Sequence, residues 1–166
     1  MRYCSGRSFP PYAFLPGRDP HPSRDPRGHS YGEEEGPADY FDPELWRENE
    51  DYLFGVDLYN AGYLWEAHEA WEGLWHRAKH DETQALFLQG LIQCAAACLK
   101  IPMKQPRGLE RLSNLGTEKL DRVVADRGPH YMGLDVIAFV EAIREFAAAA
   151  PETNEDRPLL ELALPG

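Results

Sequence analysis

Residues 65–75 read WEAHEAWEGLW and crowd tryptophan, histidine and glutamate side chains into one short stretch. If this stretch is helical, His68 and Glu72 lie four residues apart and share one face. An imidazole and a carboxylate placed in this way can bind one divalent cation together, or can form a hydrogen bond that raises the pKa of the histidine. Either arrangement supplies only part of a functional site. Glu69, next to His68 in the sequence, is the first candidate for a further ligand or a base.

The stretch does not match two known metal motifs. A zinc-protease helix needs H-E-x-x-H, and the last position is Glu72 here. A di-iron bundle needs a histidine three residues after a glutamate, whereas Glu66 and His68 are two apart. A metal would therefore need more ligands, and a mixed nitrogen and oxygen site suits zinc, manganese, iron or nickel. The ligands that the sequence offers are Glu69, then His29 or His21 of the N-terminal segment, and more weakly His76 and His80.

A second polar pair lies in the most apolar segment of the chain. Gln89 and Gln93 are four residues apart in LFLQGLIQCAAACL, and buried amides need hydrogen-bond partners. The sequence predicts that they hydrogen-bond across a helix pair. The predicted cluster is His68, Glu72, Gln89 and Gln93, walled by Trp65 and Trp75. The alternative is that these residues form a structural network, which fixes helix register and does nothing else.

These residues must be positioned by helices, because residues 42–150 repeat apolar side chains every three or four positions. We expect an all-α fold: a single antiparallel bundle of about five helices. The first helix starts with Asp42 as its N-cap and carries Leu45 inward. On the second, Glu66 points into water, and on the fourth, Gly116 permits close helix approach. The predicted ranges are about 42–60, 63–78, 81–103, from 106 onward, and 134–149.

The two ends of the chain differ from the helical part. Residues 1–41 hold half of the fourteen prolines together with several aromatic residues, which predicts an extended arm against the domain or a neighbouring subunit. A disordered tail is the alternative, and the acidic run at residues 33–36 favours it locally. Residues 151–166 form a polar tail, in which LLELAL at 159–164 is a short helix or a docking strip.

Composition excludes several classes of function. Twenty-eight acidic against seventeen basic residues give a net charge of -11, so we expect no nucleic-acid partner. No apolar run is long enough to cross a bilayer, and we expect no membrane partner and a cytoplasmic location. The three cysteines are expected to be free thiols. Cys94 and Cys98 are core residues in this interpretation, and a soft-metal pair is the alternative.

The chain resembles a known family in two places. The runs FGVDLYNAGYLWEAHEAWEGLWHRA and LQGLIQCAAACLK are similar to the bacterial and archaeal domain of unknown function 309 family. The family's marker is H-x-x-x-E-x-x-W or Y, which His68, Glu72 and Trp75 match, and the resemblance covers about residues 42–125. It implies an all-helical fold and a metal-binding role for the H-x-x-x-E residues. It implies no reaction and no substrate.

Three functions follow as hypotheses. The first is a divalent metal site with His68 and Glu72 as ligands and Glu69 as an added ligand or base. In its most specific form, this hypothesis makes the protein a metal-dependent hydrolase. The second is a non-enzymatic bundle that serves as an interaction or homo-oligomer module. The third is a small-molecule site that uses the tryptophan-walled pocket.

Overall fold

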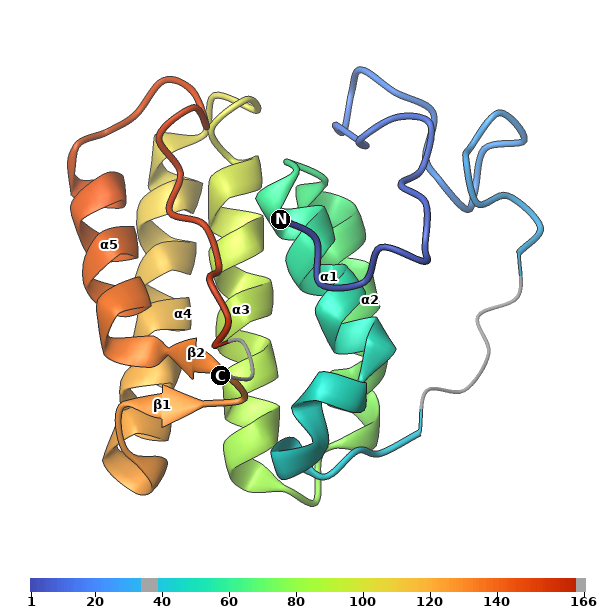
Figure 1. Ribbon diagram of the computed structural model, residues 1–166. Coiled ribbons are helices and arrows are strands. Elements are labelled where there is room, and N and C mark those ends of the chain that lie inside the picture. The colour runs from blue at the N-terminus through green and yellow to red at the C-terminus, as the bar shows by residue number, and fades with distance from the viewer. Residues whose placement is uncertain (34–38, 164–166) are drawn as a thin grey trace.

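Helices dominate the computed structural model, which describes residues 1–33 and 39–163 (Figure 1). Within these residues a short 3-10 helix, Pro43–Glu48, precedes five α-helices. The α-helices are α1 (Glu50–Asn60), α2 (Leu64–Arg77), α3 (Glu82–Leu99), α4 (Pro106–Arg127) and α5 (Val136–Ala148). The predicted all-α bundle is therefore confirmed. None of the described helices is long and apolar enough to span a membrane.

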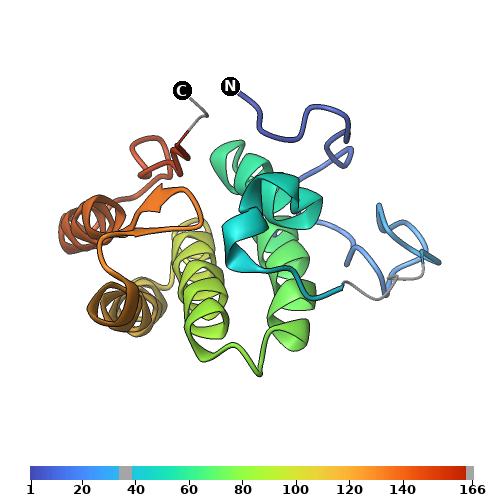
Figure 2. The ribbon, with the colours of Figure 1, turned by 60° about the horizontal axis from the view of Figure 1, so that its bottom comes forward.

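Helix α3 lies at the centre of the bundle. It packs against α2 on one side and α4 on the other, while α1 packs on α2 and α5 on α4 (Figures 1 and 2). Phe87, Leu88 and Leu91 on α3 are at most 1% exposed. The apolar run that predicted a central helix is thus buried from both sides.

The first predicted helix is broken in two. Asp42 is an N-cap as predicted, since its side chain accepts a hydrogen bond from the backbone N–H of Glu44. The 3-10 helix ends at Glu48, however, and Asn49 caps a new helix by accepting from Tyr52 N–H. The break changes the phase of the helix, so Leu45 is 48% exposed and the prediction that it points inward was wrong.

A small hairpin, which the sequence did not predict, separates α4 from α5. Strands β1 (His130–Tyr131) and β2 (Leu134–Asp135) pair antiparallel across Met132 and Gly133, which have φ of 46° and 81°. Positive φ at both central residues is typical of tight hairpin turns. Leu134 therefore belongs to a strand, and α5 begins at Val136.

The C-terminal segment is extended and docks on the bundle. Leu160 and Leu162 are 1% and 6% exposed, and Leu162 forms an antiparallel bridge with Leu134 of β2. Asn60 at the end of α1 both donates to Leu160 O and accepts from Leu160 N–H. Of the two forms predicted for this segment, the described residues adopt the docking strip; Leu164 lies outside the described residues.

The N-terminal arm lies beside α1 and α2, on the side away from α4 and α5 (Figures 1 and 2). Its first residues are held by Asp57 of α1, which accepts hydrogen bonds of 2.8 Å from Tyr3 N–H and Cys4 N–H. Asp57 is 2% exposed and also forms an ion pair with Arg2 at 3.4 Å. The acidic run predicted to favour disorder lies outside the described residues after Glu33.

The three cysteines should differ in reactivity. Cys94 and Cys98 are free and lie in the core, where burial raises the pKa of Cys98 to about 11 and raises the pKa of Cys94 as well. Cys4 is only half-buried. At pH 8 we expect Ellman's reagent to titrate one thiol in the folded protein and three in guanidinium, because a buried thiol is neither ionised nor reachable. Cys4→Ser should remove the reactive thiol, and rapid reaction of two or more thiols in the folded wild type would contradict this assignment.

Candidate metal site

The predicted cation ligands lie together on one flank of α2. Ala67, Trp71 and Leu74 turn inward and are at most 3% exposed, which fixes the rotation of the helix against α1 and α3. The side chains of His68, Glu69 and Glu72 are then left partly exposed, by 29%, 33% and 38%. They form a cluster at the border between core and solvent.

The distances within this cluster are short. His68 Nδ1 lies 3.5 Å from Glu69 Oε1, and His68 Nε2 lies 3.2 Å from Glu72 Oε2. One ligand atom from each of the three side chains can be chosen so that all lie within 4.8 Å of one another. Among the described residues this is the single group of three or more histidine, cysteine, aspartate or glutamate side chains that could hold a metal ion.

Burial controls the charge of the histidine. It lowers the pKa of His68 below its usual value, although Glu72 and a hydrogen bond to the backbone of Trp65 act in the opposite direction. The sequence allowed for a raised pKa from the neighbouring carboxylate, and the structure shows that desolvation is the larger effect. Desolvation therefore favours the neutral imidazole, which is the form that binds metals.

A neutral imidazole carries a single N–H, but both ring nitrogens of His68 face carboxylate oxygens. The nitrogen without a proton then presents its lone pair to an acceptor. Such a contact is repulsive between the two groups alone and becomes attractive when a cation lies between them. A hydrogen bond from one ring nitrogen to a backbone carbonyl, with the other nitrogen left for a metal, is also common in metal sites.

The two tryptophans predicted as walls lie on different sides. Trp65 faces the arm, where its ring meets Phe14 edge-on at 5.3 Å and His21 at 5.5 Å. Trp75 is half-buried, with Lys79 Nζ 4.8 Å from its ring centroid. The two rings therefore do not enclose one pocket with His68.

The predicted hydrogen bonds from the glutamine pair are not formed. Gln93 accepts a hydrogen bond of 2.9 Å from Lys119 Nζ, so its side chain faces α4 and not α2. Gln89 is half-buried, and neither amide bonds His68 or Glu72 within residues 1–33 and 39–163. The prediction of this network was wrong because α3 packs against both α2 and α4. The sequence does not indicate which of these two helices a given face of α3 contacts.

The other histidines lie apart from the cluster or at its edge. His76 Nε2 is 3.8 Å from Glu72 Oε1 but is mostly exposed, and His80 packs against Tyr40. His29 of the arm does reach α2, but its Nε2 contacts Glu66 Oε2 at 2.7 Å. His29 therefore bonds Glu66 and not the ligand cluster, although Glu69 of the cluster lines the same cavity as His29.

Glu66 is the largest departure from the sequence prediction. It was expected in water, yet its side chain is 5% exposed because the arm covers it. Its Oε2 accepts hydrogen bonds from His29 and from Phe14 N–H at 3.0 Å. The signal that could have indicated this contact is the aromatic content of the arm, which suits docking better than solvation.

Together these observations define an all-α bundle whose second helix carries a His/Glu/Glu cluster. The model of the family described as Domain of unknown function (DUF309) matches residues 52–112, from α1 into the first turns of α4. This match confirms the resemblance to the domain of unknown function 309 family, and it includes the whole cluster. No curated protein and no solved structure matches the chain.

Proposed function

We propose that the chain binds one divalent metal ion through His68, Glu69 and Glu72. The observation that carries the proposal is the arrangement of His68, whose two ring nitrogens both lie close to carboxylate oxygens. The three ligand atoms are already within 4.8 Å of one another, so small side-chain rotations bring them around one cation. Two carboxylates also balance the charge of a divalent ion.

The donor set favours borderline ions. One nitrogen and two carboxylate oxygens suit zinc, manganese, iron or nickel, and do not distinguish among them. Three protein ligands leave coordination positions for water, which is the arrangement of catalytic rather than structural zinc sites. The partial exposure of all three side chains would let a small substrate reach that position.

Hydrolysis is the reaction that this arrangement would support. A divalent ion lowers the pKa of a bound water, so that hydroxide forms near neutral pH. Glu72 contacts the imidazole more closely than Glu69 does, at 3.2 Å against 3.5 Å. Glu72 is therefore the firmer ligand partner of His68, and Glu69 is placed either to complete the ligand set or to accept a proton from the water.

The test is elemental analysis of protein purified without chelators. We expect about one metal ion per chain, and His68→Ala should lose it because the only nitrogen ligand is removed. His80→Ala is the matched control, since this histidine packs against Tyr40 and lies outside the cluster. Both variants should keep the helical circular-dichroism signal of the wild type.

One result would overturn the proposal. If the folded wild type contains no metal and shows no heat of binding with added zinc, manganese, ferrous iron or nickel, the cluster is not a metal site. His68 and Glu72 would then be a structural pair, and His68→Ala would change only the melting temperature or the oligomeric state.

A further inference from the structure

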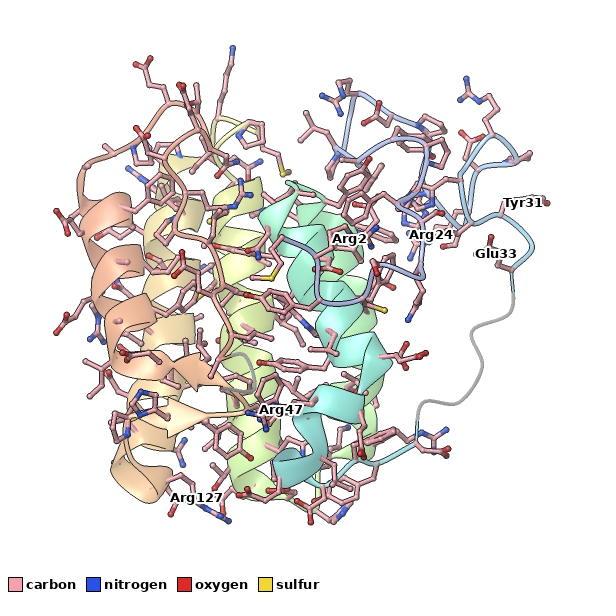
Figure 3. All side chains as sticks on the ribbon, viewed as in Figure 1. Arg2, Arg24, Tyr31, Glu33, Arg47 and Arg127 are labelled. Carbon is pink, nitrogen blue, oxygen red and sulfur yellow. The ribbon has the colours of Figure 1, made fainter. Side chains whose placement is uncertain are left out.

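A second site lies in a cavity between the arm and the helices α1 and α2. Its volume is about 420 Å³, which lies within the usual range for small-molecule sites. Ser23, His29 and Ser30 line it from the arm, and Trp65 and Glu66 line it from α2. In Figure 3, Tyr31 and Glu33 are labelled at the end of the first described part of the arm, residues 1–33.

Three of these side chains form one chain of hydrogen bonds. Ser30 Oγ lies 2.7 Å from His29 Nδ1, and His29 Nε2 lies 2.7 Å from Glu66 Oε2. The side chains of His29 and Glu66 are 3% and 5% exposed, whereas Ser30 is half-buried. The hydroxyl is thus the reachable end of the chain, and the base and the carboxylate behind it are shielded from water.

The protonation of this chain follows from its chemistry. In a neutral imidazole the proton lies on Nε2, where it is donated to Glu66, because a carboxylate only accepts hydrogen bonds. Nδ1 of His29 is then an acceptor and takes its hydrogen bond from the hydroxyl of Ser30. A nucleophile bonded to a base that a third group orients is the logic of serine hydrolases, here with the roles of the two ring nitrogens exchanged.

The loop that carries Ser30 is held firmly. Ser30 N–H donates to Pro22 O at 2.9 Å, and His29 N–H donates to the hydroxyl of Tyr12 at 3.1 Å. Tyr12 in turn donates to Pro20 O at 2.8 Å. These bonds fix both catalytic groups before a substrate arrives, which is the condition for efficient positioning.

We propose that Ser30 is a nucleophile for acyl transfer from small esters, with His29 as its general base and Glu66 as a positioning residue. Ser30 Oγ bonds to the acyl carbon, and its proton passes to His29 Nδ1. The ester C–O bond then breaks, and the alcohol leaves with that proton. Water repeats the sequence: it gives a proton to His29, its oxygen bonds to the acyl carbon, and Ser30 leaves with the proton restored.

The lining of the cavity defines the class of ester. Phe54, Leu58 and Trp65 provide apolar surface for an acyl chain. The charged groups are mostly acidic, because Glu33 and Glu69 also line the cavity and Arg7 is paired with Asp51 at 2.8 Å. Neutral or cationic esters should therefore be accepted, and anionic ones should be excluded.

A fluorophosphonate probe tests the proposal on the full-length protein, because its phosphorus reacts with an activated serine and displaces fluoride. We expect one adduct per chain by intact mass, located on Ser30 by peptide mapping and absent from Ser30→Ala. His29→Gln should slow labelling by about 100-fold or more, the usual contribution of a general base. Ser5→Ala is the matched control, since this serine of the arm is exposed and is not among the residues that line the cavity. Its labelling rate should equal that of the wild type.

The Glu66→Gln variant distinguishes a role of Glu66 in positioning His29 from a purely structural role. An amide can donate to His29 Nε2, which would place the imidazole proton on Nδ1 and remove the acceptor for Ser30. The limiting rate of labelling should then fall by up to about 10,000-fold, as expected for a base in the wrong tautomer, while the probe's binding constant is unchanged. A purely structural Glu66 would instead move both constants together.

Three results would overturn the proposal: a wild type that the probe does not label, labelling that persists in Ser30→Ala, or a rate that His29→Gln leaves unchanged. The metal proposal is tested independently, because EDTA and His68→Ala should leave the labelling rate unchanged. A labelling rate that falls with chelation would assign the reaction to the metal site instead.

Discussion

Replacing Gly116 by alanine should lower the free energy of unfolding by about 1–3 kcal/mol, because the core between α3 and α4 has no room for another methyl group. A Cβ on Gly116 would lie 2.9 Å from the carbonyl oxygen of Gly90 and 2.9 Å from Cys94 Sγ. The first of these neighbours is backbone in the middle of α3. It cannot move away unless the whole helix moves, and α3 is the helix on which α2 and α4 both pack.

Gly108→Ala is the matched control, in the first turn of the same helix. There the new Cβ would meet the side chain of Lys100, whose Cγ is 3.0 Å away and can rotate. Alanine also favours helix over glycine by up to about 1 kcal/mol, so this change should be neutral or stabilising. Urea unfolding followed by circular dichroism measures both variants. Equal stabilities for the two would show that α3 and α4 separate easily, contrary to the close packing described above.

Gly116 also shows which parts of the fold can be predicted from the sequence. Its place on the apolar stripe of α4 predicted a close helix approach, and its backbone neighbour Gly90 confirms it. The third predicted helix was likewise expected to begin at about residue 81, and Asp81 does cap α3, since its side chain accepts from Gln84 N–H. Both predictions were made from residues within a turn or two of one another on a single helix, so periodicity and capping preferences were sufficient to make them.

Features shorter than a helical turn were not predicted. The strands of the hairpin have two residues each, too few for any alternation to be recognised. Met132 adopts a positive φ of 46°, a conformation that a methionine in the sequence does not predict. Its neighbour Gly133 lies against the ring of Trp46, where a Cβ would be 2.5 Å from that ring. The hairpin is thus placed by a long-range contact that local sequence does not encode.

The same distinction separates the predicted from the unpredicted parts of the candidate sites. His68 and Glu72 come together because they are four residues apart on one helix, so helical geometry brings them to 3.2 Å. Gln93 was placed beside the wrong helix, because the choice between α2 and α4 is a matter of tertiary packing. The arm has no periodicity at all, so the sequence offered His29 only as a possible metal ligand, and its contact with Glu66 was not predicted.

Replacing Glu66 by alanine should release the arm from α2. The change leaves the imidazole of His29 and the N–H of Phe14 buried without their acceptor, at a cost of about 1–3 kcal/mol for each group. Since proteolysis follows the population of the open form, trypsin should cleave the arm about ten to a hundred times faster. The sites are the exposed arginines Arg18, Arg24 and Arg27.

Glu82→Ala is the matched control for this loss of a glutamate. Its side chain is 84% exposed and forms only a long ion pair of 3.7 Å with Arg122, so its removal should change neither cleavage nor stability measurably. An unchanged cleavage rate in Glu66→Ala would show that Asp57, which holds Tyr3 and Cys4, anchors the arm alone.

The metal content of the Glu66→Ala variant shows whether the arm affects only the cavity or also the metal-ligand cluster of α2. Glu66 and His68 are two residues apart, so their side chains leave the helix in different directions, one under the arm and one toward the exposed cluster. If the arm opens and the metal is retained, the arm covers only the cavity that Ser30 lines. If the metal is lost as well, the arm must also position Glu69, the residue that both lines this cavity and belongs to the ligand cluster.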